Sequence, residues 1–187
     1  MIFALAAAKD GGLAVDDAAL EGGLAWIDEV SDPATGRVGY DAPGSLASRT
    51  PANAHYPREK SEAMTAVGLL CRIFLGQDPR EEPLLVQHAD LLRRTLPVWD
   101  PDGLGCDMYY WYYGTYAMFQ MGGNHWKTWN AAMKTAVLDS QRLDGDERGS
   151  WDPVCPWGYA GGRVYSTALM TLCLEVYFRY TRLLAAR

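Results

Sequence analysis

Asp107 is the residue whose type and position most favour acid chemistry. It stands directly before an aromatic run at positions 109–113, in a segment whose pattern predicts a helix. A carboxylic acid held protonated in a dry pocket can donate a proton, and aromatic faces can stabilise the cation that forms. The competing interpretation is an N-cap aspartate that accepts backbone N–H bonds. Capping lowers a carboxyl pKa, which works against proton donation, so the sequence favours the cap and leaves the acid as the alternative.

The aromatic run itself predicts either a core or a ligand surface. One helical face collects Asp107, Tyr110, Trp111, Gly114 and Met118. Aromatic stripes usually fill a core, but the missing side chain at Gly114 favours a groove for an isoprenoid or another elongated apolar molecule. The residues predicted to contact such a ligand are Tyr110, Trp111, Tyr113, Met118 and Tyr165.

The sequence predicts neither a metal site nor a bound cofactor. Its four cysteines form no Cys-x-x-Cys pair, and most lie in or beside apolar runs, which is typical of small buried residues in a reducing compartment. They are Cys71, Cys106, Cys155 and Cys173. The pattern places His88 on a polar helix face, His125 at the start of an outer helix and His55 in a loop. No phosphate-binding loop, dinucleotide fingerprint or Ser-His-Asp arrangement stands in the sequence.

Composition narrows the class of protein. The 187 residues suit one domain, are 49% hydrophobic and 21% charged, and carry a formal net charge of −6. This balance argues against disorder and against a nucleic-acid partner. No apolar run approaches the roughly 18 residues of a membrane span. Residues 1–8 are apolar without a basic n-region, so we expect a helix entered partway through a longer ancestral domain, not a signal peptide, and a cytoplasmic protein.

Hydrophobic spacing predicts helices almost throughout the chain. Asp16 and Asp17 open the first strongly patterned helix, Ser61 caps the second, Pro83 begins the third and Asn124 caps the fifth. The expected helices span residues 13–30, 61–76, 83–96, 107–121, 125–143 and 165–184. Within the last of these, Glu175 needs a partner, for which Arg179 and Arg72 are the natural candidates.

Three similar glycine-rich loops indicate an internal repeat of helix pairs. They occupy residues 36–41, 103–107 and 148–152, and each ends in aspartate after an apolar or aromatic residue. Each loop precedes an apolar helix, although the spacing between copies is uneven. Residues 43–60 look like an insertion that protrudes from the first copy. We expect residues 1–187 to form a single repeat domain.

The loop at the third copy carries a family resemblance. Gln141, followed after a turn by Gly149-Ser150-Trp151, resembles the QW-type repeat of squalene and oxidosqualene cyclases. Segments 66–72, 107–114 and 161–177 are similar to bacterial prenyltransferase and squalene-oxidase repeat domains. The resemblance implies an all-α fold, an incomplete α/α toroid of about half a ring. A second copy of the chain could close that ring as a homodimer, or residues 1–8 could cap an open arc.

The resemblance also suggests which functional motifs to compare with this sequence. The acid motif of the cyclases, Asp-x-Asp-Asp, is incomplete at both Asp100-Pro-Asp102 and Asp144-Gly-Asp146. The zinc set of the prenyltransferases would use Cys106 and Asp107, but Ser166 stands where the histidine is expected. The leading hypothesis is therefore a non-catalytic scaffold that binds an apolar, isoprenoid-like ligand or a partner protein. The alternatives are a terpenoid cyclase or prenyltransferase-like enzyme with Asp107 as the acid, and a retained fold without a ligand.

Overall fold

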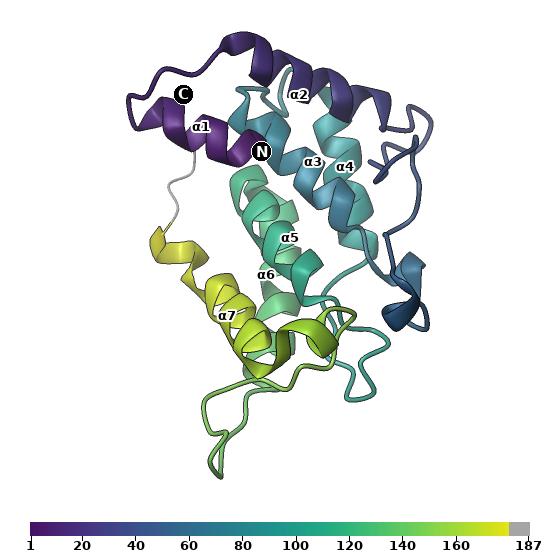
Figure 1. The fold of residues 1–187 in the computed structure, drawn as a ribbon, viewed down its shortest axis with the longest axis vertical. Helices are drawn as coiled ribbons and strands as arrows, with labels where there is room; N and C mark the ends of the chain where they lie inside the picture. Colours follow the sequence, from purple (N-terminus) through teal and green to yellow (C-terminus); the bar gives the residue numbers. More distant parts are fainter. Residues whose placement is uncertain (180–187) are drawn as a thin grey trace.

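Helices account for all the regular secondary structure in the described part of the chain, apart from one isolated bridge between Ser31 and Val38. The computed structural model describes residues 1–179 (Figure 1). Its helices are α1 (Ile2–Asp10), α2 (Asp17–Glu29), α3 (Ala63–Phe74), α4 (Pro83–Arg94), α5 (Met108–Met121), α6 (Gly123–Leu138) and α7 (Gly158–Arg179), with short 3₁₀ turns at Pro51–Asn53 and Arg58–Lys60. The predicted all-α class is confirmed.

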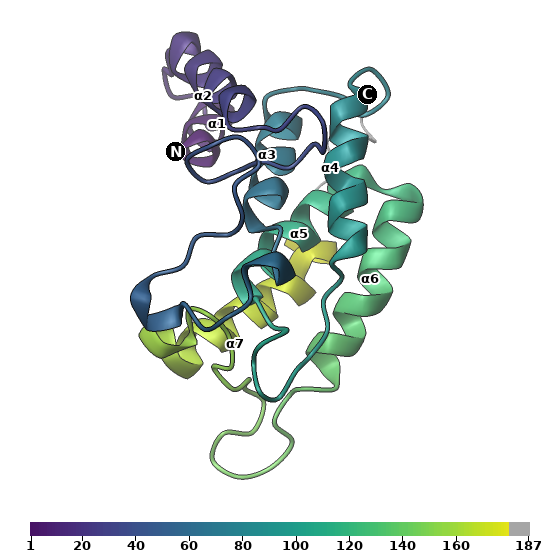
Figure 2. The ribbon, with the colours of Figure 1, turned by 90° about the vertical axis from the view of Figure 1, so that its right-hand side faces the viewer.

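The helices pack in two layers. α3, α5 and α7 lie side by side in one layer, while α4 and α6 pack against each other and cover that layer from outside (Figure 2). α1 and α2 lie together near one end of α3. Consecutive helices therefore pair as α3–α4 and α5–α6, which is a helical repeat-like arrangement. Its closure into a toroid, by a second copy or otherwise, stays a prediction.

Several helix ends follow the sequence closely. The Asp16 carboxylate accepts a bond from Ala18 N at 3.0 Å, and Asp107 accepts one from Tyr110 N at 3.2 Å, so both are N-caps. Pro83 occupies the first turn of α4 as expected. These positions are predictable because a cap depends only on neighbouring residues.

Other helix ends differ from the expectation. Glu62, rather than Ser61, stands at the N-cap of α3, and Asn124 lies inside the first turn of α6, after Gly122 at the N-cap with φ 66°. α6 ends at Leu138 because the chain turns there, with the Ser140 hydroxyl donating to the Ala136 carbonyl at 2.7 Å. The last helix bends at Gly162, and its expected extension past residue 179 lies outside the described residues.

The glycine-rich loops share a backbone conformation. The glycines at positions 36, 103 and 149 all have positive φ, at 74°, 80° and 83°. In the first and third loops a buried residue follows two positions later, Val38 and Trp151. Their backbone N–H groups donate to Thr65 Oγ1 at 3.2 Å and to Thr167 Oγ1 at 3.3 Å, each in the next helix of the same layer. The two loops are therefore built alike, which supports the predicted repeat.

Residues 43–60 do not protrude as expected. The buried Asn53 amide donates to the Pro156 carbonyl at 2.9 Å, which ties the segment to the loop before α7. The Arg58 guanidinium donates back to the Ala47 carbonyl at 2.7 Å, and Arg49 reaches Asp107 at the start of α5. The segment thus lies against the body of the molecule and covers the N-terminal end of α5.

Candidate ligand-binding groove

A pocket of about 620 Å³ opens beside the N-terminal end of α5. It contains Asp107 and the predicted ligand residue Tyr165. Its remaining walls come from residues 40–50, from α3 and α5, and from residues 157–161 around the start of α7, namely Tyr40, Ala47, Ser48, Arg49, Thr50, Ala63, Tyr109, Trp157, Ala160 and Gly161. Aromatic and small apolar side chains thus dominate a concave surface that holds one buried ion pair.

Asp107 forms that ion pair with Arg49 on the inner side of the pocket. Arg49 Nη2 lies 3.3 Å from Asp107 Oδ2, and both side chains are almost completely buried, with 6% and 3% exposed. Since Oδ1 accepts the Tyr110 N–H, both carboxylate oxygens already have a donor. Burial raises the pKa of Asp107, although Arg49 and the Tyr110 N–H act in the opposite direction. The expected lowering of the pKa by capping is therefore outweighed by desolvation.

Three polar atoms near this carboxylate are buried without a hydrogen-bond partner. They are Arg49 Nε, the Ser61 hydroxyl and the Tyr165 hydroxyl. Ser61 faces Asp107 and helps to hold its pKa down, although the pair does not reach good hydrogen-bond geometry. Burial is also the main cause of the raised pKa of the Tyr165 phenol, to which Asp107 adds. The pocket beside Asp107 therefore keeps unpartnered donors, among them Arg49 Nε and the Tyr165 hydroxyl.

A stripe of tyrosines continues the pocket along α5. Tyr109, Tyr112, Tyr113 and Tyr116 are all partly exposed, in contrast to most of the helix. The Tyr109 and Tyr113 rings are in tilted contact, with 4.8 Å between their centroids. The Phe3 ring of α1 lies 6.1 Å from the Tyr113 ring, again between centroids. We call this set of four tyrosines the tyrosine face.

The tyrosine face borders three neighbouring pockets. Tyr109 belongs both to the pocket of Asp107 and to a second one of about 470 Å³, bounded by α1, α2 and α3. Tyr113 and Phe3 in turn belong to the second pocket and to a third of about 350 Å³. The three pockets therefore follow one another along α5 from Asp107 towards the helix C-terminus, and we refer to this row of pockets as the groove.

The opposite face of α5 is core. Tyr110, Trp111 and Met118 are buried, and none of them lines the pocket of Asp107. The Tyr110 hydroxyl donates to the Thr95 carbonyl at 2.8 Å. A Cβ at Gly114 would meet the Trp129 indole at 2.5 Å, so the gap expected to form a groove is filled by a ring from α6.

Of the five predicted ligand residues, the structure places Tyr113 and Tyr165 on the groove. Tyr109, Trp157 and Arg49 line the groove as well and were not predicted. The period of the tyrosine face was readable in the sequence, because Tyr109, Tyr113 and Tyr116 follow i, i+4, i+7 spacing. Arg49 had no such signal, since it approaches Asp107 from 58 residues away.

The residues considered for zinc have other partners. The Cys106 thiol accepts the Asp100 N–H at 3.2 Å, and burial raises its pKa to about 12. The Ser166 hydroxyl donates to the Trp151 carbonyl at 2.6 Å. Within residues 1–179, no three His, Cys, Asp or Glu side chains lie close enough together to hold a metal ion. All four cysteines are free and buried.

The third-loop residues have structural partners. The Trp151 indole donates to the Val137 carbonyl at the end of α6, at 2.7 Å. The Gln141 amide donates to the Gly149 carbonyl within the loop, at 3.0 Å. The tryptophan, and not the glutamine, therefore binds the end of the helix.

Two placements from the sequence need correction. His88 is buried rather than on a polar face, and its Nδ1–H donates to the Gly36 carbonyl at 2.5 Å. Arg72 pairs with Asp28 Oδ1 at 2.5 Å, not with Glu175. The side chain of the other proposed partner, Arg179, lies outside the described residues.

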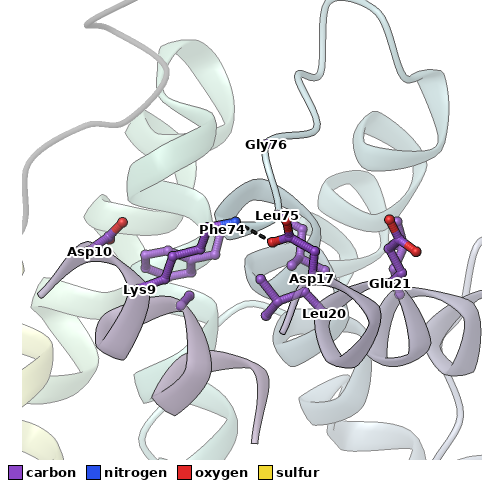
Figure 3. Close-up of a pocket in the computed structure, with 10 residues that line it drawn as sticks. Lys9, Asp10, Asp17, Leu20, Glu21, Phe74, Leu75 and Gly76 are labelled. Carbon is purple, nitrogen blue, oxygen red and sulfur yellow. Dashed lines mark hydrogen bonds and ion pairs between the residues drawn. The ribbon is translucent and has the colours of Figure 1, made fainter. Parts of the chain in front are cut away.

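A further pocket, of about 470 Å³, lies between α1, α2 and the end of α3 (Figure 3). Lys9 and Asp17 bridge it with a 2.5 Å ion pair, and Asp10 and Glu21 stand on either side. These four side chains are exposed. The ion pair holds α1 against α2, and we assign this pocket a structural role.

No family model, curated protein or solved structure gives a significant match to the chain. No helix within residues 1–179 combines the length and apolar character that crossing a membrane requires. The class that the fold defines is an all-α, helical repeat-like protein with an apolar groove along one inner helix. The resemblance to cyclase and prenyltransferase repeats stays a prediction.

Proposed function

We propose that the protein is a non-catalytic helical scaffold that binds an elongated, apolar, isoprenoid-like molecule along the tyrosine face of α5. The observation that carries this proposal is the succession of three pockets along one face of α5. Tyr109 and Tyr113 each border two successive pockets, so one extended molecule could contact all three.

The dimensions and chemistry of the groove suit such a ligand. Its largest pocket, at about 620 Å³, falls in the usual range of small-molecule sites, roughly 300–1,000 Å³. Tyrosine and tryptophan rings supply apolar area with few rotatable bonds, so little conformational entropy is lost on binding. The hydrophobic effect then favours burial of a flexible hydrocarbon along the groove.

Catalysis by Asp107 is the second candidate, because one observation favours it. Burial raises the pKa of this carboxyl group, as a proton donor requires. Against it, the two oxygens already accept bonds from Arg49 and the Tyr110 backbone, and a guanidinium partner stabilises the ionised form. These contacts favour a structural role for the Asp107 carboxylate as the N-cap of α5.

Titration with farnesol, followed by intrinsic tryptophan fluorescence, tests the binding proposal because Trp157 lies in the pocket. We expect saturable binding, weakened at least about fivefold in Tyr113→Ala, since the ring that links two pockets is lost. Tyr177→Ala is the matched control, because that tyrosine packs on Trp126 away from the groove. Equal affinity in both variants, or no saturable binding, would contradict the proposal.

Product analysis separates the scaffold from the enzyme. Gas chromatography after incubation with squalene or farnesol should return the compound unchanged. A product made by the native protein and lost in Asp107→Asn would overturn the scaffold and support the acid. Asparagine keeps an acceptor for the Tyr110 N–H, so the variant retains the helix cap.

A further inference from the structure

The pocket beside Asp107 keeps polar groups that are not hydrogen-bonded. Arg49 Nε, the Ser61 hydroxyl and the Tyr165 hydroxyl are buried without partners. Asp107, the carboxylate that lines this pocket, already accepts from Arg49 Nη2 and the Tyr110 N–H. Buried donors without acceptors are costly, so a site that keeps several of them gains free energy when an acceptor enters.

The charges in this pocket are balanced. Arg49 and Asp107 face each other at 3.3 Å, so the pair is neutral when both groups are ionised. A ligand with a full charge would lose its hydration without finding an unpaired counter-charge. An ammonium group would in addition place a second positive charge beside Arg49.

We propose that the Asp107 end of the groove recognises an uncharged oxygen acceptor, such as a ketone or ester carbonyl, at the end of an elongated apolar molecule. The inference rests on the proposed function, because the hydrocarbon part of the ligand would lie along the tyrosine face. The carbonyl accepts from the Tyr165 hydroxyl, which turns about its C–O bond, and from the buried Arg49 guanidinium. The polar end fixes the direction in which the chain enters the groove.

Three probes with eleven-carbon chains and different ends test the inference: methyl nonyl ketone, undecane and undecylamine, delivered from cyclodextrin and followed by tryptophan fluorescence. We expect the ketone to bind about fivefold more tightly than the alkane, the weight of one hydrogen bond, and the amine to bind most weakly. Tyr165→Phe should remove the preference for the ketone and leave the affinity for undecane unchanged. Tyr113→Phe is the matched control, because it deletes a hydroxyl farther along the groove and should keep the preference.

Each result has one meaning. If the ketone and the alkane bind equally to the native protein, or if Tyr165→Phe keeps the preference, the acceptor site is overturned while the groove proposal stands. If none of the probes binds, the proposed function fails and the inference fails with it. Should Tyr165→Phe lose its cooperative thermal transition, Arg49→Lys replaces it, because lysine keeps the positive charge beside Asp107 and deletes the guanidinium from which the carbonyl accepts. An unchanged ketone preference in that variant likewise overturns the site.

Discussion

The two faces of α5 have nearly the same kind of side chains and different roles. On one face Tyr110, Trp111 and Met118 are buried, and a ring from α6 fills the space above Gly114. On the other, the tyrosine face remains partly exposed and borders three pockets. The helix is apolar all round, so its own composition does not determine which face is core.

The difference is made by the neighbouring helices. Trp129 of α6 packs edge-on against Tyr110, with 5.5 Å between ring centroids, and donates its indole N–H to Thr115 at 3.0 Å. On the tyrosine face, Tyr113 contacts Phe3 of the short helix α1, and Tyr116 packs edge-on against Phe74 of α3. The three pockets therefore lie on the side of α5 that Trp129 does not cover.

Trp129→Ala should give the largest effect on stability. Removing a buried indole leaves a cavity against Tyr110 and Gly114 and should lower the free energy of unfolding by about 4 kcal/mol. Tyr113→Ala on the tyrosine face should cost about 1 kcal/mol, because that ring is already partly hydrated. Urea unfolding of both variants measures the contrast. Similar losses would mean that the two faces are equally packed.

His88 tests the packed interior through pH. Burial lowers the pKa of His88 from 6.5 to about 4, so the folded protein holds it neutral while the unfolded chain takes up a proton. The unfolding free energy should therefore fall as pH drops from about 6.5 to about 4, by about 3 kcal/mol, with no further loss from this group below that range.

His88→Gln isolates that contribution from the carboxylates that titrate in the same range. Its stability at neutral pH should be lower than that of the native protein, because the bond to Gly36 is altered. Its further loss on acidification should be about 3 kcal/mol smaller. Parallel pH dependence of the two proteins would show that His88 is not held neutral by the fold.

Gly114→Ala tests how closely Trp129 approaches α5. The added methyl group would lie 2.5 Å from the indole and should destabilise the protein by about 2 kcal/mol. The smaller ring of Trp129→Phe should relieve part of this, giving a coupling of about 1 kcal/mol in a double-mutant cycle. Gly22→Ala is the control: it lies exposed in α2 with open space around it, so alanine should stabilise by about 0.5 kcal/mol.

Thr167→Val tests the repeat construction that positions the inner helices. The change removes the acceptor of the Trp151 N–H and should cost about 1 kcal/mol. Thr65→Val should cost at least as much, because its hydroxyl also donates to Glu62 at 2.9 Å. Thr171→Val, exposed one turn farther along α7, should change stability little. Thermal unfolding of the three variants measures these losses of stability. Equal effects at all three positions would contradict the conclusion that the first and third loops are built alike.

Local features of this fold could be predicted from the sequence and distant pairings could not. The caps at Asp16 and Asp107 depend on adjacent backbone groups, and both were predicted. The choice of face on α5 depends on Trp129, which lies on another helix. The sequence left core and ligand surface open for Tyr110 and Trp111, and the structure buries both. A helix that is apolar on all sides does not indicate which of its faces will pack against the larger side chains of a neighbouring helix.

The Asp107 site shows the same limit. Its cap geometry was readable, but its partner Arg49 comes from residues 43–60, where turn-forming residues predicted a protruding loop. The direction of the Asp107 pKa followed from burial, which depends on how that segment folds back. The i, i+4, i+7 spacing of Tyr109, Tyr113 and Tyr116 indicates a second aromatic face on this helix, distinct from the face that carries Gly114.

Photolabelling with a diazirine analogue of farnesol tests the central claim most directly, because it marks which face of α5 a ligand touches. After illumination and peptide mapping, adducts should fall on Tyr109, Tyr113 and Trp157, and excess farnesol should suppress them. Adducts on Tyr110 or Trp111, or labelling confined to exposed apolar residues such as Phe178 and insensitive to farnesol, would contradict a groove along the tyrosine face.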